Sequence, residues 1–576
     1  MKRHIIILAL ALLAMQVYAQ HDEQVTVEGR YRPKANKVSK LQLQPETPQP
    51  SYTYPSSEVN PKEANQKFAL DLEKIAPTGY AAKNDKLVAP TQNFLMAGFG
   101  SRLSPLFLYK HNSMLTKTMG LGVGIKHNSS WLDMKHYAPS SFMNNAFDVT
   151  LSTSKLDGFQ IDGGVYYKNS MNHYYGVNLD SVPLTDAEVE EYCPAQSYNT
   201  IGGHFGLAST STRKSGFSHN ASLDYHYTFD KIDSKEHFAG IGYNIAYSDN
   251  WWGDKNYPQK VGIDVGAQYD YFMGRSETTN VYDRFLVKVN PFFEMSGSFY
   301  RLHAGARLDA STRMQEGDAI VGVRPDVNGS LFILNNKLEF YAGLNGGRSL
   351  LTYSEMVEEN PFLGVAYRMP YYGSGLNLRI KDVKLGFDGG VRTNIMEVVD
   401  LHLGVRYRQT KNDPFFELTN EFVGSSLISN KYDLIYDTTQ LLTVLANVRV
   451  KVRMGITADL GFAYNNYKLA TEARPWYRPA AEGRLKLTYD FNDKLAINTS
   501  FLYQGGRYAK IFDPDNIWKE EKLKDVFDLS IGADYKVTEQ ISAFVLLDNV
   551  ACQKYQLYYN YPVTGIQFFA GVKLRF

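Results

Sequence analysis

Cysteine is almost absent from this chain of 576 residues. Only Cys193 and Cys552 are present, so a disulfide framework cannot hold the fold together, and a four-cysteine zinc site is excluded. The two cysteines lie far apart in the sequence. They could pair in an oxidising compartment, but no pattern places them together. We therefore expect a fold that depends on packing and hydrogen bonding.

The chain also lacks an excess of charge of either sign. It has 61 Lys and Arg residues against 60 Asp and Glu residues. A strong basic excess is typical of nucleic-acid-binding proteins, so we expect no nucleic-acid partner. Aromatic residues, by contrast, make up 14% of the chain and include 41 tyrosines. This abundance is typical of proteins rich in β-strands.

Long hydrophobic runs are missing beyond the N-terminus. There, Lys2 and Arg3 precede the apolar run 5–15, and Val17 and Ala19 suit the −3 and −1 positions of a signal-peptidase site. We predict a signal peptide over residues 1–19 and a mature chain from Gln20. No later segment approaches ~20 consecutive apolar residues, so no transmembrane helix is expected. The signal alone leaves a soluble periplasmic or secreted protein open.

Many stretches alternate between apolar and polar residues with a period of two, the pattern of a β-strand with one apolar face. The pattern recurs in 221–230, 261–271, 401–408, 484–491 and 527–535. It is strictest at the C-terminus, where one face of the last strand holds Ile566, Phe568, Ala570, Val572, Leu574 and Phe576. The opposite face of these stretches is mostly polar, charged or small.

The length of these stretches decides between two all-β architectures. Strands of a soluble sandwich are usually ~5 or 6 residues long, whereas a tilted strand that crosses a membrane needs ~9 to 11. Many stretches here have about ten residues or more, and lipid requires the sheet to close. We predict a transmembrane antiparallel β-barrel over 91–576 in a bacterial outer membrane. At roughly 20 to 25 residues per strand and connection it would have about 22 strands, with 14–18 as the alternative.

The polar faces predict which residues line the lumen of this barrel, where substitutions tune selectivity or tighten internal packing. These residues are Asp264, Gln268, Asp270, Arg406, Arg408, Arg484, Lys486, Asp528 and Asp534. Their mixed charge indicates no preference for anions or cations. His226 and His402 also lie on polar faces, where we interpret them as hydrogen-bonding residues.

The connections between strands are predicted from turn residues and from breaks in the alternation. Short turns at 491–494 and 536–539 should face the periplasm, whereas 169–197, 411–429 and 508–524 are candidate outer loops. Within the first loop, Thr185 and Glu188 form a capping-box pattern that predicts a short helix. Trp251 and Trp252 lie between two strands, either as a membrane-interface anchor or as a platform that stacks a sugar or ring-bearing ligand.

Residues 20–90 differ from the rest of the chain. Prolines recur among polar residues there, as from Pro33 to Pro61, without sustained alternation. We predict an extended or loosely ordered periplasmic arm or a plug remnant. Its one patterned piece, residues 23–29, contains Val25, Thr26 and Val27 and is suited to adding a strand to the sheet of a partner.

The barrel resembles that of TonB-dependent receptors, particularly those of the Bacteroidota. The resemblance spans most of 91–576 and is clearest over 525–576, in the segments 529–535, 547–550 and 554–555 and in the terminal strand. It implies that Phe576 ends an assembly signal read by the barrel-assembly machinery. It also implies that Val25, Thr26 and Val27 belong either to a box that binds TonB or to the entry of a plug. Residues 20–90 are too few for the full plug domain of this family, which argues against energy-driven import by displacement of a plug.

No spacing isolates a nucleophile with a base, a phosphate loop or a set of metal ligands, so we expect neither an enzyme nor a bound cofactor or metal. Two functions stay open. The first is uptake or passage of a nutrient solute through a receptor-like barrel that lacks a full plug. The second is a structural barrel subunit of an outer-membrane assembly or secretion complex, with the arm holding periplasmic or outer-membrane partner proteins.

Overall fold

The fold is described from a computed structural model of the chain. The described residues are 92–153, 158–209, 215–253, 256–274, 281–312, 320–364, 376–396, 398–423, 426–452, 455–513, 515 and 517–576. The predicted signal peptide, the arm with Val25, Thr26 and Val27, and the start of the predicted barrel domain at residue 91 lie outside them. No helix in these ranges is long and apolar enough to cross a membrane.

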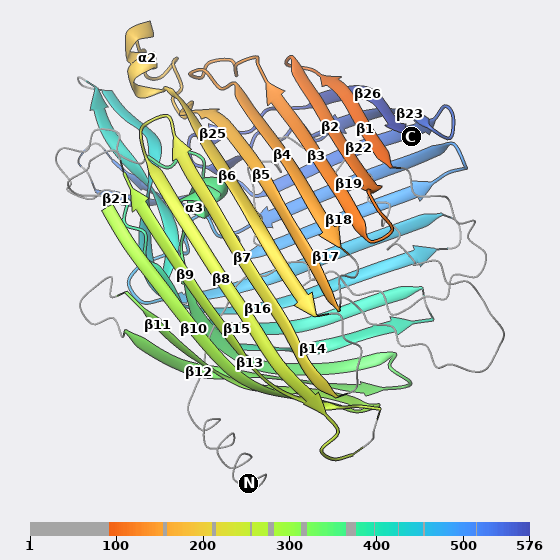
Figure 1. Cartoon of the computed structure of the whole chain (residues 1–576). Coiled ribbons are helices and arrows are strands. Elements are labelled where there is room, and N and C mark those ends of the chain that lie inside the picture. Colours follow the sequence, from red (N-terminus) through yellow and green to blue (C-terminus); the bar gives the residue numbers. More distant parts are fainter. Residues whose placement is uncertain are drawn as a thin grey trace.

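Twenty-two antiparallel strands form one closed sheet (Figure 1). They are β1 (Asn93–Gly100), β2 (Ser104–Met114), β3 (Met119–Ser130), β4 (Phe142–Thr153), β5 (Phe159–His173), β6 (Ala195–Ser209), β7 (Gly216–Asp230), β8 (Lys235–Asp249), β9 (Gln259–Met273), β10 (Val281–Ser296), β11 (Tyr300–Ser311), β12 (Val321–Ile333), β13 (Leu338–Leu350), β14 (Ile380–Ile395), β15 (Val399–Val423), β16 (Ser426–Val452), β17 (Ile456–Leu469), β18 (Ala481–Asp490), β19 (Leu495–Gly505), β22 (Val526–Lys536), β23 (Ile541–Asp548) and β26 (Gln567–Arg575).

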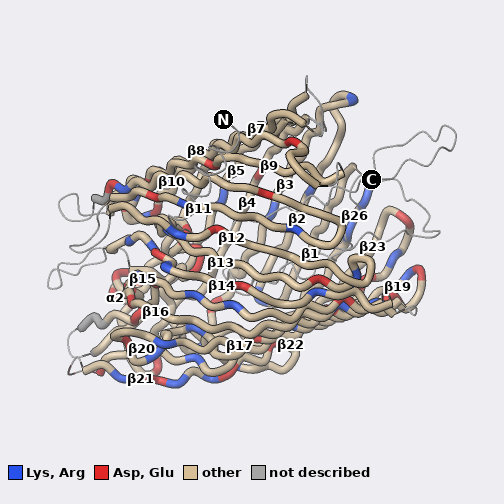
Figure 2. The backbone as a smooth tube through the Cα atoms, turned by 90° about the horizontal axis from the view of Figure 1, so that it is seen from below, with Lys and Arg blue, Asp and Glu red and all other residues tan. Residues whose placement is uncertain are grey.

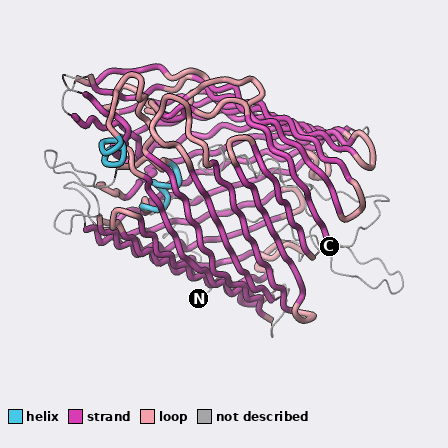
Figure 3. Tube along the Cα trace, turned by 90° about the horizontal axis from the view of Figure 1, so that it is seen from above, coloured by secondary structure: helices cyan, strands magenta, loops and turns pink. Residues whose placement is uncertain are grey.

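Within the described parts of the connections lie four short strands and two helices. They are the hairpin β20 (Tyr508–Phe512) and β21 (Trp518–Lys522), the hairpin β24 (Gln556–Tyr558) and β25 (Tyr561–Pro562), and the helices α2 (Asp186–Tyr192) and α3 (Tyr353–Glu359). Both helices lie toward the same end of the barrel (Figure 3).

The sheet closes because the first strand pairs with the last. β1 and β26 are antiparallel, with Phe94 opposite Arg575 and Gly100 opposite Phe569. At the end of the seam, the Asn93 N–H donates to the Phe576 carbonyl over 2.8 Å, and the Phe576 N–H donates to the Asn93 carbonyl over 3.1 Å. Each of the 22 strands therefore has a paired neighbour on both sides, and the predicted number of about 22 strands is confirmed.

The outer face of the barrel is apolar, as the alternation predicts. Val261, Val265 and Tyr269 of β9 are exposed, and so are Phe527, Ile531 and Tyr535 of β22. Their neighbours Asp270, Asp528 and Asp534 are buried. In water such a surface would be unstable, whereas in lipid it is solvated, and the closed sheet satisfies its backbone groups internally. The chain is thus an outer-membrane barrel.

Acidic and basic residues are intermingled along the strands, without a region of one sign (Figure 2). This agrees with the balanced composition of the chain.

The connections at one end of the barrel are short, including the predicted turns 491–494 and 536–539. The other end holds the longer connections and is the outer end by the usual arrangement of such barrels. The predicted helix in the first long loop is confirmed as α2, where Thr185 and Glu188 form both hydrogen bonds of a capping box.

Most of the predicted outer loop at 411–429 is strand instead. β15 and β16 pair as far as Val423 and Ser426, because this part of the hairpin has its own buried apolar residues, Phe415, Phe416 and Leu418. The loop predicted at 508–524 carries the hairpin of β20 and β21.

The two cysteines form no disulfide within the described ranges. Cys193 is buried, and Asn430 Nδ2 lies 3.6 Å from its Sγ, whereas Cys552 is exposed. The fold holds without a covalent cross-link between them.

The seam is packed around two glycines. Gly98 of β1 faces Gly571 of β26, and the ring of Phe544 from β23 covers both. A Cβ at Gly571 would lie 2.7 Å from Phe544 Cε1, and one at Gly98 would lie 2.8 Å from Phe544 Cζ. The closing strands approach each other because neither residue has a side chain.

We predict that Gly571→Ala destabilises the barrel by roughly 2 kcal/mol, because overpacking forces the ring and the seam apart. The measurement is urea unfolding in detergent micelles, followed by tryptophan fluorescence. Gly532→Ala on β22 is the matched control, since its Cβ would meet no atom closer than the Val545 carbonyl oxygen at 3.5 Å. Equal stability of the two variants would contradict the proposed role of the glycine pair.

Candidate functional site: a strap above a polar cavity

The connection between β13 and β14 folds into the barrel. We call residues 351–364 the strap; it contains α3, which begins at the N-cap residue Thr352. The Glu355 N–H donates to Thr352 Oγ1 over 3.2 Å, and the Thr352 N–H donates to the Glu355 carboxylate over 3.3 Å. This capping box allows a helix of only two turns to form. Tyr353, Met356 and Val357 bury one face of it.

The start of the strap is attached to β7 and β8. The Glu236 carboxylate, which is fully buried, accepts hydrogen bonds from the N–H groups of Tyr353 and Ser354. It thereby caps the positive end of α3. The Tyr353 hydroxyl donates to Asp230 over 2.7 Å, and Ser354 Oγ lies 3.1 Å from His226 Nε2.

The end of the strap reaches other parts of the wall. The Tyr198 hydroxyl of β6 donates to the Pro361 carbonyl over 3.0 Å, and the Tyr174 hydroxyl, just after β5, donates to the Leu363 carbonyl over 2.7 Å. The Gly364 N–H donates to the Tyr432 carbonyl of β16 over 2.8 Å. β7 to β12 separate β6 from β13 in the sheet, so the strap crosses the lumen.

Aromatic residues of the outer connections pack on the strap. The rings of Phe362 and Tyr561 stack with their centroids 3.6 Å apart, and Tyr558 meets Phe362 edge-on at 6.1 Å. Tyr432 and Tyr477 extend this buried cluster. Since aromatic rings bury large areas, the cluster makes the outer end of the barrel a packed core.

Two arginines, the buried Arg507 and the partly buried Arg478, hold the connections around this cluster. Arg507 donates to the carbonyls of Leu557, Lys524 and Gln556 over 2.9 to 3.2 Å, and burial lowers its pKa to about 10. Arg478 Nη1 lies 2.9 Å from Glu359 of the strap. Burial alone would lower the pKa of Arg478, but the charge of Glu359 raises it above its ordinary value. Both side chains stay cationic at neutral pH.

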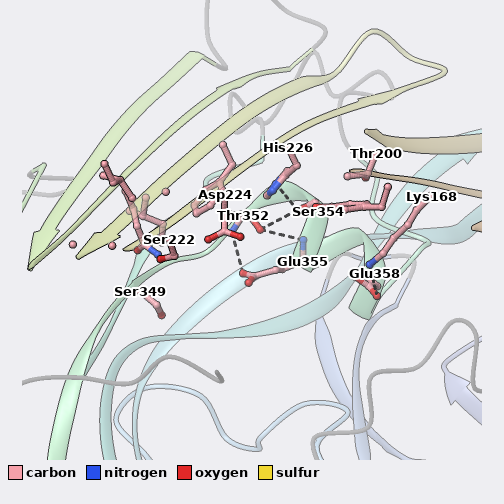
Figure 4. A pocket seen from close by; sticks show the side chains of 18 of the residues that line it. Lys168, Thr200, Ser222, Asp224, His226, Ser349, Thr352, Ser354, Glu355 and Glu358 are labelled. Atoms are coloured by element: carbon pink, nitrogen blue, oxygen red, sulfur yellow. Dashed lines mark hydrogen bonds and ion pairs between the residues drawn. The ribbon is translucent and has the colours of Figure 1, made fainter. Parts of the chain in front are cut away.

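A cavity of about 1240 Å³ lies against the strap, between it and the wall formed by β3 to β11. Figure 4 shows Ser354 of the strap facing His226 of the wall, and Glu358 of the strap facing Lys168. Lys168 Nζ is 3.6 Å from Glu358, and His226 stacks on Phe238 with ring centroids 4.9 Å apart. The cavity is larger than the ~300–1,000 Å³ of common ligand pockets.

The predicted lumen residues separate into two groups. Asp264 and Gln268 line the cavity, and Asn290 Nδ2 donates to Asp264 over 3.3 Å. The other predicted residues lie elsewhere on the barrel wall, where most form an ion pair or a hydrogen bond. Asp270 pairs with Arg284, Arg406 and Arg408 with Asp388, Asp534 with Lys573, and Asp528 accepts from the Tyr555 hydroxyl, while Arg484 and Lys486 lie half-buried on β18.

The strap itself was missed in the sequence. Its signal is Thr352 followed by Glu355, the same capping pattern that predicts α2. The amide side chains of the cavity were also missed. Asparagine is common on the polar face of any strand, and only the strand register brings these residues together.

Trp251 and Trp252 lie between β8 and β9 at the end with short turns, and both stack near Phe293. Phe576 lies at the end of the seam. In the described part of the chain, no group of three or more His, Cys, Asp or Glu residues is placed to hold a metal ion.

No protein-family model and no curated protein sequence matches the chain. Solved structures do. The siderophore receptor PirA of Acinetobacter baumannii has a TM-score of 0.62 and 11% identity, over 86% of this chain and 81% of that one. FpvA of P. aeruginosa, bound to pyoverdines, has a TM-score of 0.61 and 12% identity, over 85% and 72%. The ferric-catecholate import receptor Fiu of E. coli K12 has a TM-score of 0.58 and 9% identity, over 86% and 82%. The chain shares their barrel fold.

We predict that Glu236→Ala detaches the start of the strap. The buried N–H of Tyr353 and the partly buried N–H of Ser354 lose their acceptor, at a cost of about 3 kcal/mol. Hydrogen exchange should then become faster at Tyr353 and Ser354 while the barrel strands stay protected. Glu358→Gln is the control on the same helix, because its half-exposed ion pair contributes ~1 kcal/mol at most. Unchanged exchange in Glu236→Ala would show that the other contacts alone fix the strap.

Proposed function

We propose that the chain is a receptor-like outer-membrane barrel for the uptake of a nutrient solute. The observation that carries this proposal is the polar cavity inside a closed barrel, bounded by a strap that crosses the lumen. The similarity to barrels named as siderophore and import receptors supports it. A solute bound from outside would rest on the wall of β3 to β11 and on the strap.

Transport through this barrel requires the strap to move. Hydrogen bonds, ion pairs and packed aromatic side chains hold the strap. None of these contacts belongs to the strand ladder, which cannot open without exposing backbone groups to lipid. The strap is therefore the element that we expect to control passage. Nothing in this arrangement requires a chemical step, so we propose transport and not catalysis.

The energy source that fits this proposal is a periplasmic partner of the TonB type. Val25, Thr26 and Val27 would add a strand to its sheet, and Phe576 would be read by the barrel-assembly machinery. A Bacteroidota origin and a reduced plug in residues 20–90 belong to the same proposal, and both rest on the sequence.

We predict that replacing residues 353–363 by a short Gly-Ser linker raises the permeability of the barrel. Proteoliposomes that hold the variant should swell in an arabinose solution several-fold faster than those with the wild type, because the lumen of a 22-strand barrel is wide. Replacing α2, which has no buried residues, by the same linker should have no effect. If the strapless barrel is impermeable and purifies with stoichiometric partner proteins, the uptake proposal fails and the structural-subunit alternative replaces it.

We also predict that deletion of residues 23–29 abolishes uptake by cells while the barrel remains at its normal level in the outer membrane. The reason is that this deletion removes the strand offered to the partner and leaves the described barrel intact. Growth on the transported nutrient and an immunoblot of outer membranes are the two measurements. Normal uptake by this variant would contradict coupling through Val25, Thr26 and Val27.

A further inference from the structure

The cavity contains buried amide groups without partners. Asn128 of β3 lines it and is 3% exposed. Neither its Oδ1 nor its Nδ2 has a hydrogen-bond partner among the described residues. Asn144 Nδ2 and Gln268 Oε1 are buried there in the same condition. Because a buried polar group without a partner is unfavourable, these atoms point to a polar occupant of the cavity.

The strand register brings two of these amides side by side. Asn128 is directly opposite Asn144 on β4, which is opposite Ser170 on β5, which is opposite Tyr198 on β6. Ser170 Oγ donates to Asn144 Oδ1 over 2.8 Å, which leaves the amide nitrogen of Asn144 available. Because an amide side chain has both a donor and an acceptor, this row of side chains offers both kinds of hydrogen-bonding group on one wall of the cavity.

The formal charge of the lining side chains is balanced. The cations Lys126, Lys168, Lys288 and Arg307 equal in number the anions Asp224, Asp264, Glu355 and Glu358. A site for an anionic ferric complex would be expected to have an excess of cations. Here the charged groups compensate one another, and the amides and hydroxyls are left to recognise a ligand.

Ring surfaces accompany the amides. Tyr166, Tyr198 and Phe238 all line the cavity. Aromatic faces pack against the C–H faces of sugar rings, while amides and hydroxyls exchange hydrogen bonds with sugar hydroxyl groups, each of which both donates and accepts.

We propose that this cavity binds a neutral oligosaccharide, with Asn128 and Asn144 hydrogen-bonded to its hydroxyl groups. The proposal rests on the uptake function above and names its substrate class. A ligand of several sugar rings fits the volume of about 1240 Å³.

The test is isothermal titration calorimetry of the full-length protein in detergent. The neutral probes are maltotetraose, cellotetraose, xylotetraose and mannotetraose, and the anionic probes are a ferric tris-catecholate complex and a sialylated trisaccharide. We expect at least one neutral probe to bind and the anionic probes not to bind. Asn128→Leu together with Asn144→Leu should weaken that binding by about tenfold or more, because two ligand hydrogen bonds are lost.

Asn466→Leu is the matched control. Asn466 is exposed on β17 and does not line the cavity, so its loss should leave the affinity unchanged. Binding of an anionic probe alone, binding of no probe, or equal weakening by the control would each overturn the proposal. If the double variant does not assemble, the wild-type panel still decides between neutral and anionic ligands. The strapless barrel tests uptake separately, since its swelling does not depend on these amides.

Discussion

The structure depends on one constraint, that a peptide group in lipid must find its hydrogen-bond partner within the protein. This constraint requires β1 to meet β26, and it requires every strand to be long enough to cross the hydrocarbon layer. It also explains the outer surface, since only apolar side chains can accompany a satisfied backbone there. At the seam, the two strands can pair closely because Gly98 and Gly571 have no side chain and the ring of Phe544 packs over both.

A barrel of so many strands encloses a wide interior. Small barrels are filled by their own side chains, but wider barrels enclose space. Here that space is divided. The strap and an aromatic cluster occupy the outer end, ion pairs such as Arg284 with Asp270 line part of the wall, and a neutral polar cavity remains. The cations and anions that line this cavity are equal in number, as they nearly are in the whole sequence.

Features with a short-range pattern could be predicted from the sequence, and features made by distant residues could not. The alternation around Val261 to Tyr271 and the capping residues Thr185 and Glu188 are local, so the strands, their number and α2 were accessible. The contact of Glu236 with Tyr353 spans 117 residues, and no local pattern announces it. The hairpin at 411–429 was mistaken for a loop because its apolar residues pack on a core that only the folded barrel creates.

The seam also determines when the chain can finish folding. The residues that close it are 483 positions apart, so the ring has the largest sequence separation that this fold allows. β1 and β26 each keep an unpaired edge until they meet, and unpaired strand edges template aggregation. The sheet is therefore complete only when this long-range pairing has formed. Until then, the apolar faces of its strands need protection from water and from one another.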